Sequence, residues 1–315
     1  MEYRSLGRTG IKVSKICLGA GYLGHKPPED ASIKLVHTAL DLGINFIDTA
    51  DLYVQGQSEI VLGKALKGIR DQIFVATKFF NPTGPGINNK GLSRLHIMRT
   101  VEASLTRLDI DAIDLYQVHH YDPDTPLDET LRALDDLIRN GKVRYIGCSN
   151  FAAWQLCKSL WISDRLGIGR FETLQPQYSL IHRDIEREII PFCKEEKVGL
   201  IAHSPLGAGF LTGKYKPNAS PDTNARIQNS DRLNNLMSHQ NLRIIKALKT
   251  VAEERCCSMV QVALAWVLRD PTISSAICGV SSSAQLEENV EASGMKLSQD
   301  ELQIILNAFE EEHTT

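Results

Sequence analysis

The sequence has no apolar run that approaches the roughly 20 residues of a membrane-spanning helix, so we expect no membrane partner. Its first residues, Met-Glu-Tyr-Arg-Ser-Leu-Gly, lack the apolar core of a signal peptide, and we expect a cytoplasmic protein. A surplus of positive charge is missing too, since 35 Lys and Arg stand against 38 Asp and Glu, for a formal net charge of -3. Because there is no basic run either, the charge balance gives no support for nucleic-acid binding.

The cysteine pattern argues against a disulfide scaffold and against a metal site. The 7 cysteines are odd in number and irregularly spaced. The adjacent Cys256 and Cys257 are predicted to lie mid-helix, between Ala252 and Ala263, as buried or idle thiols. No Cys/His cluster has metal-ligand spacing, and the adjacent His119 and His120 are expected on opposite faces of a strand. We therefore predict that no metal is bound.

Internal repeats and linkers rich in Pro, Gly or Ser are also absent, so we expect one domain over residues 1–315. Short apolar segments alternate with segments of helical periodicity along the chain. The predicted strands are 16–18, 45–47, 73–77, 113–118, 143–148, 172–175, 199–202 and 274–278. The predicted helices are 30–42, 58–66, 93–108, 126–139, 154–166, 184–196, 241–255, 260–269, 285–292 and 298–309. A hairpin is predicted over 3–13, and a long polar segment over 207–240 interrupts the pattern.

This alternation predicts the fold class. Strand-helix units with apolar strands imply a parallel sheet that is buried on both faces. Eight such units close naturally into a barrel. The predicted fold is therefore an α/β (β/α)8 TIM barrel with an N-terminal β-hairpin and extra C-terminal helices.

Polar residues follow the predicted strands, at the end of the barrel where active sites are built. Asp48, Lys78 and His119 each stand at a strand end, and Tyr53 lies in the loop after Asp48. A free phenol has a pKa near 10, too high for efficient proton transfer at neutral pH, but an ammonium held by a carboxylate lowers it. A histidine can hydrogen-bond a substrate oxygen. Each residue alone also has a structural explanation, but the set is typical of carbonyl reduction, in which an oxygen is protonated as it becomes an alkoxide. There is no nucleophilic serine elbow to support hydrolysis.

Two further patterns mimic other dehydrogenases. Residues 19–24 spell the dinucleotide fingerprint Gly-x-Gly-x-x-Gly after a strand. The fingerprint requires the third glycine to open a helix, whereas Gly24 runs into His25-Lys26-Pro27-Pro28. Tyr22 and Lys26 have the spacing of a catalytic Tyr-x-x-x-Lys pair, but they lie in the same Pro/Gly loop. We interpret this segment as a glycine-rich loop of the barrel.

The chain resembles the aldo-keto reductases along nearly its whole length, in an ordered series of motifs. These are Gly-Ile-Asn-Phe-Ile-Asp-Thr-Ala-Asp-Leu-Tyr at 43–53, Val-Ala-Thr-Lys at 75–78, Asp-Leu-Tyr-Gln-Val-His at 114–119, Gly-Lys-Val-Arg-Tyr-Ile-Gly-Cys-Ser-Asn at 141–150 and Ser-Pro-Leu-Gly at 204–207. Leu-Thr-Gly-Lys-Tyr at 211–215 and Gln-Leu-Glu-Glu-Asn at 285–289 resemble the bacterial, plant and potassium-channel-β-like branch.

The resemblance implies an NADP-dependent oxidoreductase that interconverts aldehydes or ketones and alcohols. Tyr53 would be the general acid/base, Lys78 would tune its pKa, Asp48 would pair with Lys78, and His119 would orient the carbonyl. The hydride would come from the nicotinamide C4 of NADPH. The alternative is an NADPH-binding regulatory subunit with little turnover, as in the channel-associated members.

The resemblance also implies a cofactor site. Ser149, Asn150 and Gln175 would hold the carboxamide, and His203 would stack on the nicotinamide in place of the usual Tyr or Trp. The other implied cofactor-binding residues are Gly21, Tyr22, Asp48, Ser204, Pro205, Leu206, Gly207, Lys214, Gly279, Ser281, Ser282, Gln285, Glu288 and Asn289. Many members place Lys or Arg near Ser281 to meet the 2′-phosphate of NADPH, so this chain leaves NADH open as the cofactor. We hypothesise that Arg226 supplies the charge instead.

The predicted pocket takes a small carbonyl or alcohol. Its walls are predicted from Tyr22, Leu23, Leu52, Phe79, Phe80, Tyr121 and residues 214–237. Phe79, Phe80 and Tyr121 indicate an apolar or aromatic wall, which suits an aromatic aldehyde, a ketone or a sugar. His120 is expected at the pocket rim or facing outward.

Overall fold

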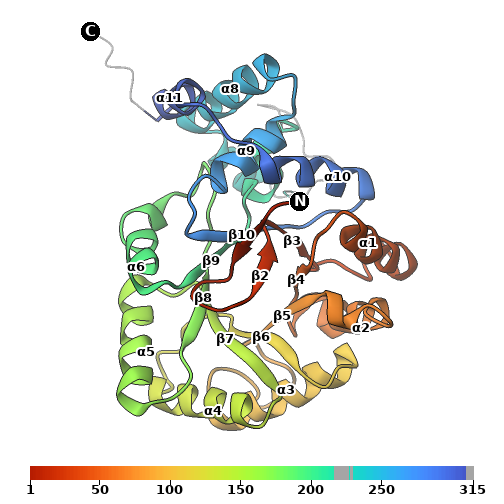
Figure 1. The fold of residues 1–315 in the computed structure, drawn as a ribbon, viewed down its shortest axis with the longest axis vertical. Coiled ribbons are helices and arrows are strands. Elements are labelled where there is room, and N and C mark those ends of the chain that lie inside the picture. Colours follow the sequence, from red (N-terminus) through yellow and green to blue (C-terminus); the bar gives the residue numbers. More distant parts are fainter. Residues whose placement is uncertain (216–226, 228–229, 310–315) are drawn as a thin grey trace.

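The strands of the molecule close into a ring, as a computed structural model shows for residues 1–215, 227 and 230–309 (Figure 1). The barrel strands are β3 (Ile16–Gly19), β4 (Phe46–Asp48), β5 (Phe74–Phe79), β6 (Ile113–Val118), β7 (Val143–Ser149), β8 (Phe171–Gln175), β9 (Gly199–Ala202) and β10 (Ile273–Cys278). They follow the order β10-β3-β4-β5-β6-β7-β8-β9, and every neighbouring pair is parallel. The predicted (β/α)8 barrel is confirmed.

Helices surround the barrel (Figure 1). They are α1 (Glu29–Asp41), α2 (Gln57–Ala65), α3 (Arg94–Leu108), α4 (Leu127–Arg139), α5 (Ala153–Leu166), α6 (Ile189–Glu196), α7 (Ser230–Leu236), α8 (His239–Glu254), α9 (Met259–Val267), α10 (Ser283–Glu291) and α11 (Gln299–Asn307). Helix α4 shows why the sequence forms them, because Leu127, Leu131 and Leu134 recur at helical spacing and are buried. It stops where Gly141 adopts a φ of 73°. No helix among the described residues is long and apolar enough to cross a membrane.

Among the described residues, five short 3-10 segments complete the regular structure: η1 (Tyr53–Gly56), η2 (Arg70–Gln72), η3 (Asp184–Glu186), η4 (Gly207–Thr212) and η5 (Ala292–Gly294). The single helix predicted over 184–196 is wrong, since η3 and α6 are separate. The reason is Pro191, which has no N–H to bond the carbonyl of Arg187 and whose ring crowds that carbonyl, so the helical hydrogen bonds cannot run on through it. Glu188 leaves the helical conformation with a φ of -128°, and α6 starts at Ile189.

The N-terminal hairpin closes one end of the barrel. Strands β1 (Tyr3–Ser5) and β2 (Lys12–Ser14) are antiparallel, as predicted. Leu6 and Val13 of the hairpin pack with interior strand residues, which are Cys17, Phe46, Ala76, Leu115 and Ile201. These side chains form an apolar layer at the amino ends of the strands.

The opposite end of the barrel interior is polar. Alternate strand residues face the same side, so the positions that follow the apolar layer also point inward. On β4 and β5 these positions are Asp48 and Lys78, and on β6 the position is Gln117. A polar layer therefore lies above the apolar one, at the carboxyl ends of the strands.

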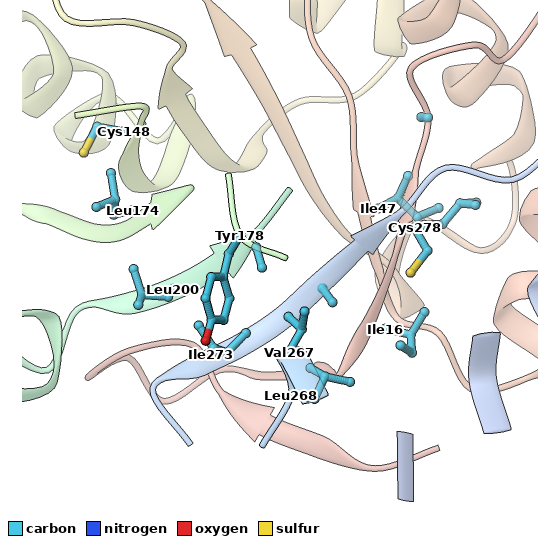
Figure 2. Packing of buried hydrophobic residues seen from close by; sticks show 14 of the residues in the cluster. Ile16, Ile47, Cys148, Leu174, Tyr178, Leu200, Val267, Leu268, Ile273 and Cys278 are labelled. Atoms are coloured by element: carbon cyan, nitrogen blue, oxygen red, sulfur yellow. The ribbon is translucent and has the colours of Figure 1, made fainter. Parts of the chain in front are cut away.

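Outward-facing strand residues fix the barrel against its helices (Figure 2). Ile47, Leu174 and Leu200 belong to one large buried cluster with Val267 of α9. Burying each such side chain contributes about 1.5–3 kcal/mol, so the wall that carries the polar strand ends is held firmly in place.

The cysteines are free, as expected, and all of them lie in the described part of the chain. The placement of Cys256 and Cys257 inside a helix is wrong. Helix α8 ends at Glu254, Cys256 has a φ of 53°, and Ser258 begins α9 with a capping box. The cause is this cap, which satisfies the first amides of a new helix.

Two loop predictions have different outcomes. The glycine-rich segment after β3 does not open a helix at Gly24, and α1 begins only at Glu29, so the rejection of a dinucleotide fingerprint is confirmed. The polar segment over 207–240 includes η4, α7 and the first residues of α8, while 216–226 and 228–229 lie outside the described residues.

Candidate active site

A pocket of about 390 Å³ opens at the carboxyl ends of the barrel strands. It is lined by residues at or just beyond the ends of seven strands, and by Gly21 and Tyr53 of two loops: Gly19, Gly21, Asp48, Tyr53, His119, His120, Ser149, Asn150, Gln175, His203, Ser204, Ile277 and Gly279. The predicted catalytic residues Asp48, Tyr53 and His119 are thus brought together from separate parts of the chain. The fourth, Lys78, lies buried directly beside Asp48.

Asp48 and Lys78 form a buried ion pair inside the barrel. Lys78 Nζ lies 2.5 Å from Asp48 Oδ1 and donates a second hydrogen bond of 2.6 Å to the Thr49 carbonyl. Both side chains are almost inaccessible, with 1% and 3% exposed. Burial alone disfavours the ammonium, but the charges and hydrogen bonds of Asp48 and Tyr53 outweigh it and raise the pKa of Lys78. Lys78 is therefore a permanent cation at neutral pH.

Two glutamines hold the other oxygen of Asp48. Gln175 Nε2 donates to Asp48 Oδ2 over 2.8 Å, and Gln117 Nε2 donates to the same atom over 3.2 Å. Gln117 was not among the predicted site residues. A signal was present, because Gln117 lies between Leu115 and His119 at the spacing of inward-facing residues.

Tyr53 begins η1, the turn that follows β4. The Tyr53 ring centroid lies 5.1 Å from Lys78 Nζ, and a hydrogen bond between the two side chains contributes to the raised pKa of Lys78. Gly21 lies against the ring, since a Cβ at Gly21 would stand 3.8 Å from Tyr53 Cε2. The phenol is therefore in contact with an ammonium on one side and with the pocket on the other.

His119 reaches the pocket beyond the end of β6. Its ring lies edge-on to Tyr53 at 6.1 Å, and Nδ1 is buried without a hydrogen-bond partner among the described residues. Burial, reinforced by the charge of Lys78, lowers the pKa of His119 to about 3. The imidazole is therefore neutral at physiological pH.

The expectation that His119 and His120 point to opposite faces is wrong. Their rings stack with centroids 4.9 Å apart and an interplanar angle of 1°. The alternation applies only within a strand, and β6 ends at Val118. His120 lines the pocket and contacts Phe80 edge-on at 5.4 Å. Within the described ranges no group of His, Cys, Asp and Glu has an arrangement suited to a metal ion.

The residues predicted to hold the carboxamide adjoin one another at the ends of β7 and β8. Ser149 Oγ donates to the Gln175 carbonyl over 2.7 Å, and Asn150 Nδ2 donates to Ser149 Oγ over 3.0 Å. Gln175 Nε2 already donates to Asp48, so the side-chain atom of Gln175 that is left for a ligand amide is Oε1. His203 lines the same pocket, with Nε2 3.0 Å from Asn150 Oδ1 and Nδ1 3.3 Å from Ser204 Oγ.

The residues predicted for the adenosine end lie at the start of α10. Ser282 is the N-cap, and the Ser281 amide and hydroxyl both contact Gln285 Oε1, at 2.9 and 3.2 Å. All three side chains are exposed. Of the two residues predicted at the adenine, Glu288 is half-buried and Asn289 is 3% exposed.

The loop after β9 carries the remaining predicted cofactor residues. Ser204 and Gly207 have positive φ values of 54° and 56°, so the chain turns sharply on both sides of Pro205 and Leu206. Lys214 Nζ lies 5.2 Å from the Tyr215 ring centroid. Arg226 is outside the described residues.

The predicted aromatic wall needs correction. Phe79 is fully buried and stacks on Tyr116 at 4.5 Å, on the outer side of the barrel wall. The reason is alternation along β5, because Lys78 points inward and Phe79 therefore points outward. Tyr22 is 48% exposed and Leu23 is buried in the core, and neither lines the described part of the pocket. Nor do Leu52, Phe80 and Tyr121 belong to that lining.

The chain matches a protein-family model and several known proteins. A model of the Aldo/keto reductase family matches residues 15–309, a range that includes every barrel strand. The probable voltage-gated potassium channel subunit beta of Arabidopsis thaliana is 36% identical over 299 residues, which cover 93% of this chain and 91% of that protein. The uncharacterized oxidoreductase YrpG of Bacillus subtilis is 37% identical, and the match covers 98% of this chain and 96% of that protein. The versiconal hemiacetal acetate reductase of Aspergillus parasiticus is 35% identical, and the match covers 97% of this chain and 96% of that protein.

Proposed function

Because the chain belongs to the aldo-keto reductase family, we propose that it is an NAD(P)H-dependent reductase that interconverts aldehydes or ketones and alcohols. The observation that supports this most directly is the contact of Tyr53 with Lys78, which is itself paired with Asp48. Tyr53 is the general acid/base of this proposal. Lys78 stabilises its phenolate, and Asp48 holds Lys78.

The arrangement accounts for proton transfer at neutral pH. A phenol that has donated its proton becomes a phenolate, and the ammonium of Lys78 stabilises this charge at low cost because the ammonium is already in place. Asp48 in turn is held by three donors from β5, β6 and β8, so the pair does not need to reorganise during the reaction. General acid catalysis of this kind contributes typically about 10²–10⁴-fold to a rate.

His119 has a different part in the proposal. Since its imidazole is neutral, it binds the substrate oxygen by a hydrogen bond and leaves Tyr53 as the proton donor. The edge-on contact with Tyr53 brings the two groups to the same side of the pocket. A carbonyl oxygen between them would accept a hydrogen bond from each.

The residues present fit a nicotinamide dinucleotide. When bound, NADPH supplies the hydride from C4 of its nicotinamide. Asn150 and Gln175 offer their side-chain oxygens to the carboxamide. His203 offers a ring whose pKa is lowered to about 4 by burial, so that it is uncharged against the nicotinamide. The exposed start of α10 offers the Ser282 hydroxyl to a phosphate, since this oxygen accepts from the Gln285 amide and its O–H can still donate. We propose NADPH as the preferred cofactor, with NADH as the alternative and Arg226 as a source of charge.

The experiment is to follow NADPH consumption with an activated aromatic aldehyde and to repeat it with NADH. We expect Tyr53→Phe to lower kcat by at least about 10²-fold, because the phenol is the proton donor. Tyr121→Phe is a matched control, since Tyr121 directly follows the lining residue His120 but is outside the described pocket lining. Full turnover by Tyr53→Phe would overturn the assignment of Tyr53.

A second candidate function is an NADPH-binding regulatory subunit with little turnover. The 36% identity to the probable voltage-gated potassium channel subunit beta of Arabidopsis thaliana favours it. Calorimetric titration with NADPH, alongside assays on a panel of aldehydes and ketones, separates the two candidates. Tight binding without turnover on any carbonyl would support the regulatory function and contradict the reductase.

A further inference from the structure

Asp51 is a buried acid whose carboxyl has no hydrogen-bond partner among the side chains of the described residues, and the Leu52 amide is the backbone group that favours its ionised form. It lies two positions before Tyr53, has 5% of its surface exposed, and neither carboxyl oxygen forms a hydrogen bond within the described part of the chain. A buried carboxylate without donors is costly, whereas a buried carboxylic acid costs much less. Burial, together with the charge of Glu59, raises the pKa of Asp51 to about 7. None of the steps described for the pocket uses this group.

The neighbours of Asp51 are already paired with one another. Glu59 of α2 accepts a hydrogen bond of 2.6 Å from Thr77 and forms an ion pair of 2.7 Å with Arg107 of α3. The charges acting on Asp51 are therefore Glu59, which disfavours its ionisation, and Arg107 and Lys78, which favour it. The Tyr116 hydroxyl, bonded to Thr100, also senses its charge. Because Glu59 and Arg107 neutralise each other, an ionised Asp51 would leave one negative charge in excess outside the barrel wall.

The segment that holds Asp51 also holds Tyr53. The Asp51 amide donates to the Lys78 carbonyl over 3.0 Å, and the Tyr53 amide donates to the Ala50 carbonyl over 3.2 Å. Beyond Tyr53 the chain turns through Val54 and Gln55 with φ of 49° and 57°, a conformation that costs a non-glycine residue energy.

Gly56 then brings this turn against Arg107. A Cβ there would stand 3.0 Å from Arg107 Cδ and 3.6 Å from the Asp51 carbonyl oxygen. Arg107 and Asp51 therefore both contact the turn that fixes Tyr53.

We propose that Asp51 is a positioning residue for Tyr53, whose carboxyl must hold a proton for the turn from Asp51 to Gly56 to keep Tyr53 against Lys78. With the proton in place, the neutral acid is accommodated beside the Glu59–Arg107 pair. When the proton leaves to solvent, the unpaired carboxylate draws Arg107 from Glu59 or moves outward to water, and the strained turn moves with it. This inference rests on the proposed role of Tyr53 as general acid.

The first test is spectroscopic and needs no cofactor or turnover. The protein is labelled with 13C at the Asp carboxyls and the Tyr ring carbons, and the Asp51 and Tyr53 signals are identified from their loss in Asp51→Asn and Tyr53→Phe. We expect both signals to shift with one midpoint near pH 7. We expect the Tyr53 signal of Asp51→Asn to show no step at this pH. A midpoint near 4 for Asp51, or an unchanged Tyr53 step in Asp51→Asn, would overturn the proposal.

The second test is the pH dependence of kcat for carbonyl reduction. A single ionisation near pH 7 lowers the native rate about tenfold from pH 6 to pH 8, and Asp51→Asn should flatten this fall to about twofold or less. Asp109→Asn is the matched control, because Asp109 is an exposed acid at the end of α3, and it should keep the native profile. A purely structural role would lower the rate of Asp51→Asn equally at every pH and leave the midpoint in place.

Two neighbours sharpen the test by moving the midpoint in opposite directions. Glu59→Gln removes the charge that opposes ionisation and should lower the midpoint, while Arg107→Gln removes a favourable charge and should raise it. If either variant fails to fold, the comparison of Asp51→Asn with Asp109→Asn still decides. If no carbonyl is reduced at all, the proposed function fails, whereas the link between Asp51 and Tyr53 is still tested by the 13C signals.

Discussion

Asp48 and Asp51 are three positions apart, but the fold places their carboxyl groups in different hydrogen-bonding environments. Asp48 points into the barrel, where Lys78, Gln117 and Gln175 donate hydrogen bonds to its two oxygens. Asp51 is nearly as buried, but its oxygens have no partner among the described residues. Burial itself therefore does not decide whether a carboxyl is charged. The donors and the charges within reach contribute to it as well.

Strand β5 separates the two environments. Lys78 points inward to Asp48, while its neighbour Thr77 points outward to Glu59. Each face of the strand thus carries its own charged network. The comparison teaches that the site is not confined to the pocket, because the turn that holds Tyr53 is shared by both networks.

The largest effect is expected from breaking the inner network. Lys78→Met removes the cation and leaves Asp48 buried with only its two glutamine donors. We expect a loss of about 3–5 kcal/mol in the free energy of unfolding, as for other broken buried ion pairs. We also expect kcat to fall by at least about 10²-fold, because the Tyr53 phenolate loses its counter-charge. Urea denaturation and steady-state kinetics measure the two effects, and Lys64→Met on the exposed side of α2 is the control.

Replacing Asp48 and Asp51 by Asn, one at a time, should change the free energy of unfolding in opposite directions. Asp48→Asn leaves the Lys78 ammonium buried without its partner and should destabilise the protein by about 3 kcal/mol at pH 8. Asp51→Asn removes a carboxylate that has no partner and should stabilise the protein at the same pH. Urea denaturation of both variants at pH 8 measures this contrast. A destabilising Asp51→Asn would contradict the account of the outer network.

The raised pKa of Asp51 also makes the stability of the protein depend on pH. The pKa of Asp51 is higher in the folded chain than in the unfolded chain, so the folded state binds the proton more tightly. The contribution of this bound proton to the free energy of unfolding is complete below about pH 4 and is lost as the pH rises toward about 7. The shift corresponds to at most about 4 kcal/mol. The difference in free energy of unfolding between Asp51→Asn and the native chain should therefore grow between pH 4 and pH 7 and level off above it.

A smaller effect is expected for Gln117→Leu. This change removes one of the donors to Asp48 Oδ2 and leaves the other donor, Gln175, in place. A hydrogen bond to a charged group is worth about 1.5–3 kcal/mol, and we expect a loss near the lower limit because the 3.2 Å contact is long. Thermal denaturation measures it. No change in stability would show that Gln175 and Lys78 suffice to hold Asp48.

The smallest effect concerns the turn itself. Gln55 is exposed and has a φ of 57°, a conformation that Asn tolerates better than Gln. Gln55→Asn should stabilise the protein by about 0.5 kcal/mol and leave the pH midpoint of the Tyr53 signal unchanged. A shifted midpoint would show that the strain of the turn, and not the charge of Asp51, controls Tyr53.

Several site features were readable from the sequence because they depend on chain order alone. Asp48, Lys78 and His119 end apolar segments, and parallel strands of one barrel end on the same side. Gln117 and Phe79 were readable in principle from alternation along β6 and β5. The stacking of His119 and His120 was not, because the two residues lie beyond the last hydrogen-bonded position of the strand.

The sequence by itself determined the barrel, its hairpin and the side on which the polar residues gather, because these follow from the period of the apolar pattern and from the order of the strands. Only the tertiary structure decided the environment of Asp51. Its burial depends on α2 and α3, which bring Glu59 and Arg107 from distant positions to the outer face of β5. A carboxyl has the same chemistry in any sequence, but its charge depends on the donors and charges that the folded chain places around it.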